Sequence, residues 1–338
     1  MAVDCVVGVD LGGTNVRAAA VDVDGNVVGQ RFEDPSRAQD GTEAIFDAVA
    51  GVIAKVQEQS TVSLGSVGLS VPGHIDNKRG LVRWAPNFGE TVDGVFYYWK
   101  DVQLRNAMQD RTGLKVVMGN DANCAALGEY QYGSGRAKAN CLVLLTVGTG
   151  IGGGVVMTPD CLDGESRGPL LLLGGNQGGA ELGHVTVAHG GLDCNAGSYG
   201  AVEAYCQRDS IVRRAQHKLR RGQTSVILEM VGNDLSAVTP LVLSEAAEAG
   251  DTVAKEVWRE VGIYLGASIG SFINVFAPDV FAIGGQISKA GKWLLEPAIA
   301  EARNVAIPSL YADCRIVQAE QVDDAGLLGA AALAWQHA

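Results

Sequence analysis

The sequence is short of positive charge. Among its 338 residues, 26 are Lys or Arg and 38 are Asp or Glu, which gives a formal net charge of −12. A chain with this charge repels a phosphate-coated polymer, so we expect it not to bind nucleic acid. One basic cluster stands apart, within residues 213–221. Its charges alternate with apolar residues at helical spacing, which predicts a solvated helix face.

Paired cysteines and long hydrophobic runs are also missing. The seven cysteines form no C-x-x-C pair, which is typical of reduced thiols in a cytosolic protein. The first residues, MAVDCVVGVD, lack the basic start of a signal peptide. Residues 139–159 carry no charge, but five glycines interrupt them and predict strand, turn and strand instead of a membrane span. We therefore predict a cytoplasmic protein with no membrane partner.

Glycine, by contrast, is plentiful. The chain has 45 glycines, about twice the average share, and they gather in clusters at the ends of predicted strands. Glycine allows tight turns and close approach of the backbone to a ligand. The clusters therefore mark candidate ligand loops.

The strands and turns follow a scheme that occurs twice. An apolar strand at 4–10 leads through a glycine turn into a strand at 15–23 and a hairpin to 26–30, and a strand at 142–147 leads through 148–154 into 155–157. Further strands are predicted at 66–70, 115–118 and 280–283, and helices at 45–56, 122–132, 244–276 and 325–335. This duplication predicts an α/β fold with ligand loops between two halves.

The two glycine turns share the pattern of an acidic or hydroxyl residue followed by Gly and Thr. Backbone N–H groups and hydroxyls of such turns can face one anion, as the phosphates of a nucleotide require. The residues concerned are Asp10, Gly12, Gly13 and Thr14 in the first turn, and Thr146, Gly148, Thr149 and Gly150 in the second. Asp10 also suits Mg²⁺, held directly or through water. The alternative is two ordinary hairpin turns with a buried or capping Asp.

Two other phosphate-binding patterns are excluded. Residues 148–153 fit G-x-G-x-x-G, but they lead into Val-Val-Met, a predicted strand, so no helix N-terminus would meet the anion. No G-x-x-x-x-G-K-[ST] sequence occurs, which excludes a P-loop.

Asp121 is the candidate general base. It stands between a predicted strand and a predicted helix, next to Asn120 and Asn123, whose amides can bind a polyol. The alternative for Asp121 is a helix N-cap worth about 1 kcal/mol. Glu181 and His184 lie three residues apart and face one pocket if that segment turns helically. The alternative for His184 is a half-buried structural histidine.

At this point the sequence resembles one family. Residues 10–17 (DLGGTNVR), 120–123 (NDAN), 146–154 (TVGTGIGGG), 181–184 (ELGH) and 283–285 (IGG) stand in the order and spacing of the ROK family, and the chain looks like its bacterial glucokinases. The resemblance implies an actin-like or hexokinase-like (ribonuclease H-like) two-domain fold with a ligand cleft between the domains. We place one domain at 1–119, joined by about 323–338, and the larger one at 120–322.

The resemblance also implies roles for individual residues. Asp121 is the expected general base. The expected sugar contacts are Asn87, Asn120, Glu181, His184 and Glu203. The two glycine turns would line the phosphates of ATP with Mg²⁺ at Asp10, and Gly284 and Gly285 would lie on the adenosine side.

The family's structural zinc site is degenerate here. Its ligands are the motif histidine and three cysteines in C-x-C-G-x-x-G-C, but here Cys194 is followed by Ala196 and Ala201 at the other two cysteine positions. Structural zinc is almost always four-coordinate, so we predict no zinc. Cys206 or His189 could substitute only with a rearranged loop.

Three further departures concern the neighbourhood of these motifs. Ala180 replaces a glycine before Glu181, and Gln286 replaces a third glycine after Gly285. The segment 155–179 is longer than usual for the family, and a loop of that length is either functional or a surface excursion.

The resulting hypothesis is an ATP- and Mg²⁺-dependent kinase that converts glucose to glucose 6-phosphate, expected as a homodimer. The alternatives are a kinase for N-acetylmannosamine, fructose or allose, a kinase that uses polyphosphate, and a non-catalytic sugar-binding regulator. The family's repressors carry a helix-turn-helix ahead of the first phosphate motif, whereas nine residues precede Asp10 in this acidic chain.

Overall fold

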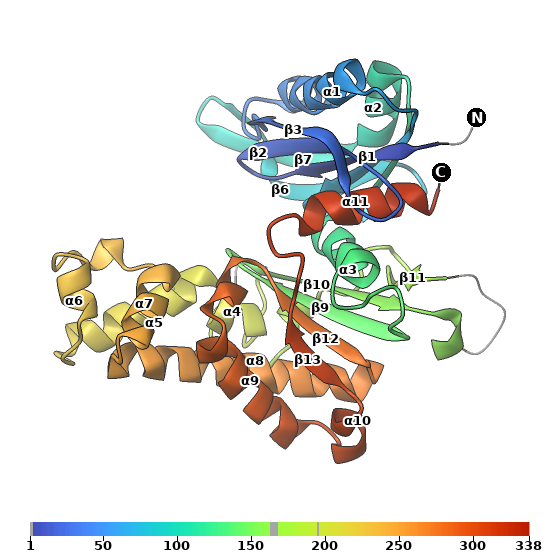
Figure 1. The fold of residues 1–338 in the computed structure, drawn as a ribbon. Helices are drawn as coiled ribbons and strands as arrows, with labels where there is room; N and C mark the ends of the chain where they lie inside the picture. The colour runs from blue at the N-terminus through green and yellow to red at the C-terminus, as the bar shows by residue number, and fades with distance from the viewer. Residues whose placement is uncertain (1–2, 163–167, 195, 338) are drawn as a thin grey trace.

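The computed structural model describes residues 3–162, 168–194 and 196–337, which form two α/β domains (Figure 1). The first domain is built on a five-stranded sheet in the order β3-β2-β1-β4-β8. Its strands are β1 (Cys5–Leu11), β2 (Asn15–Val21), β3 (Val27–Pro35), β4 (Leu64–Val71) and β8 (Lys115–Asn120). The first three strands are antiparallel, while β4 runs parallel to β1 and β8 parallel to β4.

The second domain repeats this arrangement. Its sheet has the order β11-β10-β9-β12-β13, in which β9 and β10 form an antiparallel hairpin and β12 runs parallel to β9. The strands are β9 (Cys141–Val147), β10 (Ile151–Met157), β11 (Leu170–Leu171), β12 (Val280–Gly284) and β13 (Arg315–Gln318). The hairpin β9–β10 thus corresponds to β1–β2, which confirms the predicted duplicated fold. The domain boundaries we propose remain 1–119 with 323–338, and 120–322.

A small third sheet, absent from the prediction, belongs to the first domain. It contains β5 (His74–Asp76), β6 (Leu81–Val92) and β7 (Val95–Val102). The pairing of β6 with β7 is irregular between Ala85 and Gly89. Pro86 lies in this irregular stretch and supplies no N–H to a ladder, which explains why the sequence lacks a clear strand pattern here.

Two helices join the domains. Helix α3 (Asp121–Tyr132) packs against α11 (Ala325–Trp335), and α11 also covers β1 and β4 (Figure 1). A methyl group on Gly68 would overlap the Ala330 carbonyl, so glycine is needed for α11 to approach β4 this closely. On the far face of the first sheet lie α1 (Thr42–Gln59) and α2 (Leu104–Thr112). The buried side chains of α1 follow the predicted helical spacing.

The remaining helices belong to the second domain. They are α4 (Val202–Cys206), α5 (Arg208–Arg220), α6 (Ile227–Met230), α7 (Pro240–Glu248), α8 (Thr252–Phe276), α9 (Lys292–Val305) and α10 (Pro308–Ala312). Helices α5 and α7 pack against α8 beside the sheet (Figure 1). The prediction of a single long helix at 244–276 is wrong, because the helix is interrupted between α7 and α8. Gly250 has a φ of 96°, and the Asp251 side chain caps α8 by accepting a 2.8 Å bond from Ala254 N–H.

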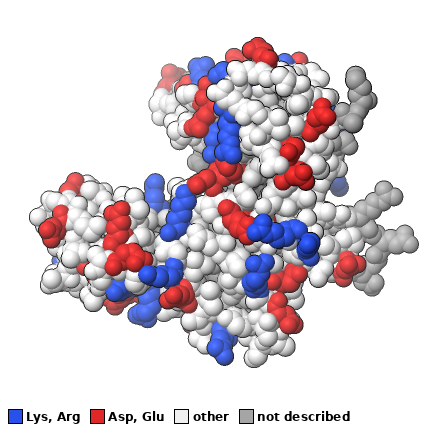
Figure 2. All heavy atoms as spheres, in the orientation of Figure 1, with Lys and Arg blue, Asp and Glu red and all other residues white. Residues whose placement is uncertain are grey.

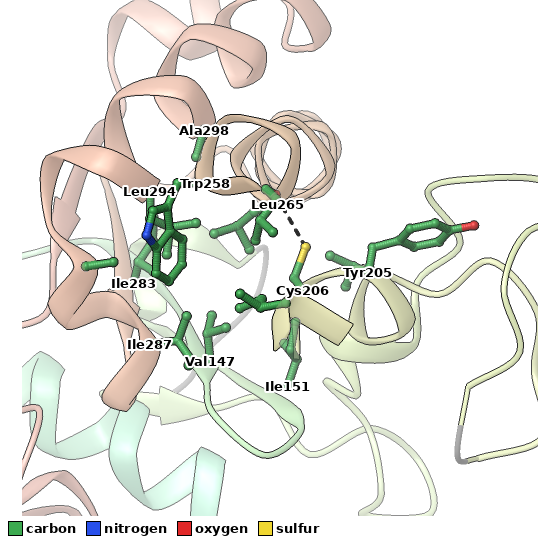
Figure 3. Close-up of a cluster of buried hydrophobic side chains, with 14 of the residues drawn as sticks. Val147, Ile151, Tyr205, Cys206, Trp258, Leu265, Ile283, Ile287, Leu294 and Ala298 are labelled. Atoms are coloured by element: carbon green, nitrogen blue, oxygen red, sulfur yellow. Dashed lines mark hydrogen bonds between the residues drawn. The ribbon is translucent and has the colours of Figure 1, made fainter. Parts of the chain in front are cut away.

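The core of the second domain positions α4 beside the β9–β10 turn. In Figure 3, Cys206 of α4 points towards α8, and its Sγ donates to the carbonyl oxygen of Val261 at 3.5 Å. Val147 and Ile151, which flank the β9–β10 turn, are buried in the same cluster. Helix α4, which carries Glu203 in its first turn, is therefore held next to this turn.

The basic cluster predicted as a solvated helix face lies on α5. Arg214 and Lys218 are directed to α8 instead, with Nη1 2.7 Å and Nζ 2.8 Å from the carboxylate of Glu260. Arg213 and Arg220 are exposed. The prediction is therefore correct for only part of the cluster. Figure 2 shows charges of both signs interspersed over the visible face. Within the described ranges, no helix has both the length and the apolar character needed to cross a bilayer.

Candidate active site between the domains

A cavity of about 760 Å³ lies between the two domains. The first domain contributes the β4–β5 turn and the irregular stretch of β6, and the second contributes the start of α3, the β9–β10 turn and the segment before Leu182. Of the predicted site residues, those that line it are Asn87, Asn120, Asp121, Thr146, Gly148, Gly150, Glu181, His184, Glu203 and Gly285. The structure thus brings together residues that are separated by up to two hundred positions in the sequence.

Six predicted residues lie outside this lining: Asp10, Gly12, Gly13, Thr14, Thr149 and Gly284. Gly12 closes the β1–β2 turn by donating its N–H to the Asn15 carbonyl at 2.9 Å. Gly284 is buried at the end of β12, where an added methyl carbon would lie 3.3 Å from the Ala319 side chain. The phosphate and adenosine roles of these residues stay predictions.

Asp10 is held by two polar partners. Arg17 Nη2 lies 2.7 Å from Asp10 Oδ2, and the Ser70 hydroxyl donates to Asp10 Oδ1 at 3.1 Å. The Asp10 carboxylate therefore has few free acceptor positions. These residues fit Mg²⁺ bound through water better than a bare cation taking both carboxylate oxygens.

Asn120, and not Asp121, is the N-cap of α3. Its Oδ1 accepts from the N–H groups of Ala122 at 3.0 Å and Asn123 at 3.2 Å. Asp121 occupies the first helical position, and its Oδ1 accepts from Ala122 N–H at 2.9 Å. Since Asn120 caps the helix, the second carboxylate oxygen of Asp121 is left without a helix partner. It is available to a ligand in the cavity.

The environment of Asp121 disfavours its ionised form. Its side chain is exposed to solvent at the cavity wall, and the protein atoms packed around it displace part of its hydration shell. This desolvation raises the pKa of Asp121 to about 6, assisted by the negative charges of Asp10 and Glu181 and opposed by hydrogen bonds from the backbone N–H groups of Ala122 and of Asp121 itself. A carboxylate with a pKa just below neutrality is a competent general base at pH 7.

Glu203 lies in the first turn of α4 and is 8% exposed. Its Oε2 accepts a 2.8 Å bond from the N–H of Ile151. A side chain on Gly150 would come within 2.8 Å of the same oxygen. Glycine is therefore needed at 150 for Glu203 to reach the β9–β10 turn.

Glu181 and His184 face the same cavity, as their spacing predicts. A short 3-10 helix at Leu182–His184 turns the chain, and Glu181 Oε2 lies 4.0 Å from His184 Nε2. The half-buried His184 is directed both to this carboxylate and to Cys194, whose Sγ is 3.8 Å from His184 Nδ1.

His184, Cys194 and Glu203 could hold a metal ion. One ligand atom from each lies within 4.8 Å of the others. Burial opposes the thiolate of Cys194, but hydrogen bonds from Ser198, from two backbone N–H groups and from His184 outweigh it and lower the pKa of Cys194. Ala196 and Ala201 offer no fourth ligand. The group fits a three-ligand site with an open position and does not fit a closed structural zinc site.

Sequence reasoning missed two residues that line the cavity, His74 and Trp84. His74 follows the Val-Pro-Gly end of β4, and Trp84 packs edge-on against Tyr98 with ring centroids 6.3 Å apart. Both come from the small sheet that the sequence pattern does not reveal. Neither has a local signal that distinguishes it from an ordinary strand residue.

Comparison with known proteins gives the family of the chain. The ROK family model matches residues 6–337. The chain is similar to the glucokinase of Thermotoga maritima, at 34% identity over 328 residues, which are 97% of this chain and 96% of that protein. It is also similar to the DNA-binding transcriptional repressor Mlc of Escherichia coli, at 30% identity over 271 residues, which are 80% of this chain and 60% of that protein.

Among solved structures, a ROK family glucokinase from Streptomyces griseus in complex with glucose and AMPPNP superimposes with a TM-score of 0.79. Its sequence is 32% identical, and the match covers 98% of this chain and 99% of that one. The fold, the order of the motifs and the family match agree over nearly the whole length. The chain therefore belongs to the ROK family, within which it is similar to bacterial glucokinases.

Proposed function

We propose that the protein transfers the γ-phosphoryl group of ATP to a hexose, converting glucose to glucose 6-phosphate, with Asp121 as general base. One observation carries this proposal: Asp121 faces the cavity between the domains while Asn120 takes over the capping of α3. The similarity to glucokinases supports glucose as the acceptor.

The sugar side of the site is rich in groups that match hydroxyls. Asn87 offers an amide, Glu181 and Glu203 offer carboxylates, and His184 offers an imidazole. Asn120, whose Oδ1 caps α3, can add the Nδ2 hydrogen that is not donated to Gly73. Amides donate and accept, while carboxylates only accept, so this set can satisfy several hydroxyls of one ring. Because the groups come from both domains, closure of the domains on the sugar would complete the set and exclude water.

The chemical step is an in-line displacement. The hydroxyl oxygen at C6 attacks the γ-phosphorus, its proton passes to the Asp121 carboxylate, and the bond from phosphorus to the β–γ bridging oxygen breaks to release ADP. The proton leaves late in the transfer, so a base with a pKa of about 6 is sufficient. Asn120 holds the helix end that carries this base.

No Lys or Arg is among the described residues that line the cavity, although Arg17 contacts Asp10 beside the first glycine turn. Backbone N–H groups of the β9–β10 turn would meet part of the charge of a nucleotide, and Mg²⁺, when bound near Asp10, would supply further neutralisation. A long polyphosphate needs a row of cations, so this lining favours MgATP as donor. Thr146 and Thr149 would add hydroxyls to the phosphates, and Gly284 and Gly285 would lie on the adenosine side.

The setting we propose is the cytoplasm, with neither nucleic acid nor membrane as partner and without a four-ligand structural zinc. The acidic net charge of −12 supports the first of these exclusions. A homodimer is the expected assembly, and light scattering after size-exclusion chromatography tests it.

The proposal is tested by ADP release from MgATP with glucose, N-acetylmannosamine, fructose and allose in turn. A parallel series replaces ATP by polyphosphate and follows sugar phosphate. We expect turnover with glucose and ATP. Turnover with another hexose alone would contradict the choice of glucose. Sugar binding without turnover on any donor would contradict catalysis and favour a non-catalytic sugar-binding protein.

A further inference from the structure

The loop of residues 174–180, here named the docking loop, leaves its own domain and contacts the other one immediately before Glu181. His74 Nε2 lies 3.0 Å from the carbonyl oxygen of Asn176. The N–H of Asn77 donates to Gln177 Oε1 at 2.8 Å. These two hydrogen bonds attach the second domain to β5 and the turn after it, at the edge of the cavity.

The same segment of the first domain is tied to the catalytic helix. The Asn120 Nδ2 group donates to the carbonyl oxygen of Gly73 at 3.0 Å, and Asn120 caps α3. Residues 73–77 therefore lie between the loop that leads to Glu181 and the helix that begins at Asp121. A shift of the docking loop changes the position of Glu181 relative to Asp121.

The contact of the docking loop with His74 is close. A methyl carbon on Gly178 would lie 2.8 Å from His74 Nε2, well inside van der Waals contact. Gly175, in the same loop, has open space where its side chain would be. The loop thus has one position where a side chain interferes with docking and one where it does not.

The backbone of the docking loop is also strained. Gln177 and Ala180 both have a φ of 64°, in the left-handed region that non-glycine residues rarely adopt. Such conformations are unfavourable and persist when surrounding contacts impose them. The contacts with His74 and Asn77 hold the loop from the other domain, and hydrogen bonds within the loop, such as Gln177 N–H to the Gly174 carbonyl, hold it locally.

We propose that His74 and Gln177 are positioning residues: they dock the loop across the domain boundary and thereby hold Glu181 in the sugar subsite. This inference rests on the proposed kinase function and adds to it the residues that set sugar affinity. His74 lines the cavity beside Pro72 and Gly73, and Gln177 is outside its lining. Loss of docking therefore weakens sugar binding and leaves the chemical step and ATP binding unchanged.

The test is steady-state kinetics of His74→Ala and Gln177→Ala at saturating MgATP. We expect the KM for glucose to rise about tenfold, as for the loss of about 1.4 kcal/mol of binding, with kcat and the KM for ATP within about twofold of wild type. His74→Gln keeps an N–H donor at a similar reach and should restore most of the affinity. His217→Ala, at an exposed position of α5, is the matched control, and its kinetic constants should equal those of the wild type.

A second pair of variants tests docking by steric exclusion. Gly178→Ala should raise the KM for glucose, and Gly175→Ala should not. In the His74→Ala background the ring that the new methyl would meet is gone, so the double variant should show no larger KM than His74→Ala alone. Additive effects of His74→Ala and Gly178→Ala would overturn the proposal, as would an unchanged KM or equal losses in kcat and in ATP affinity.

Failure of the kinase hypothesis would be recognised separately. If the wild-type protein binds glucose in calorimetry but does not turn over, the proposed function fails. Docking is then judged by the dissociation constant for glucose. A rise of about tenfold in Gln177→Ala supports positioning, and an unchanged constant overturns it. If the wild type binds no hexose, both proposals fail.

Discussion

Arg17 on β2 lies directly opposite Asp10 on β1, and its Nη2 is 2.7 Å from Asp10 Oδ2. The Ser70 hydroxyl donates a hydrogen bond to the other carboxylate oxygen, Oδ1, at 3.1 Å. The carboxylate proposed for Mg²⁺ is thus fixed in direction by two strands of the first sheet. A fixed carboxylate can orient the water shell of a cation without giving up its own hydrogen bonds.

Asp10→Asn should raise the Mg²⁺ concentration needed for half-maximal turnover about tenfold, because a neutral amide attracts the hydrated cation less strongly than a carboxylate. The measurement is a titration of Mg²⁺ at fixed ATP and glucose. Asp4→Asn, at an exposed carboxylate just before β1, is the control. An unchanged Mg²⁺ requirement would show that Asp10 is only a structural partner of Arg17.

The rate with glucose should depend on the ionisation of Asp121. Partial desolvation and the charges of Asp10 and Glu181 raise its pKa to about 6, so kcat/KM should fall about tenfold per pH unit below that value and level off above it. Glu181→Gln removes one of these charges and should move the midpoint to lower pH. Glu229→Gln, at an exposed residue of α6, should leave the midpoint in place. A profile that stays flat down to pH 4.5 would contradict Asp121 as base.

The same pKa predicts a stability effect. A carboxyl group whose folded pKa of about 6 exceeds the ordinary 3.8 stabilises the fold most when protonated, and this contribution is lost as pH rises through 6. Asp121→Asn should therefore melt at a higher temperature than wild type at pH 8. The difference should shrink towards pH 4. Thermal scans at the two pH values measure it, and a lower melting temperature for the variant at pH 8 would contradict the pKa.

Removal of metal should leave the fold intact. His184, Cys194 and Glu203 form at most a three-ligand site, so a zinc chelator should not change the melting temperature or the glucose-dependent rate. Elemental analysis of the purified protein should find zinc well below one atom per chain. Stoichiometric zinc whose removal lowers the melting temperature would contradict this, and Cys194→Ala would then show whether these residues hold it.

Local sequence signals predicted much of the fold. The glycine turns after β1 and β9 mark the duplicated hairpins, and helical spacing reveals α1 and α11. The small sheet was not predicted, because Pro86 and the irregular pairing of β6 interrupt the apolar–polar alternation that identifies a strand. The interruption between α7 and α8 was not predicted, because the apolar periodicity continues across Gly250. A hydrophobicity pattern carries no information on the positive φ of this residue.

The site also contains residues that local sequence patterns predict and contacts that they do not. Asp121, Glu181 and His184 carry signals of residue type and spacing, and the structure places all three at one cavity. The contacts of His74 with Asn176 and of Asn77 with Gln177 join residues about a hundred positions apart. No local pattern encodes such pairs, so they emerge only once both domains are folded.

The central claim is that Asp121 removes the proton from the attacking hydroxyl, and Asp121→Asn tests it most directly. The amide keeps an oxygen that can accept the bond from Ala122 N–H, so the start of α3 should stay in place. We predict that kcat with glucose and MgATP falls by about 10²–10⁴-fold, while the dissociation constant for glucose measured by calorimetry stays within about threefold of wild type. Turnover close to wild type in this variant, with glucose bound equally well, would contradict the claim.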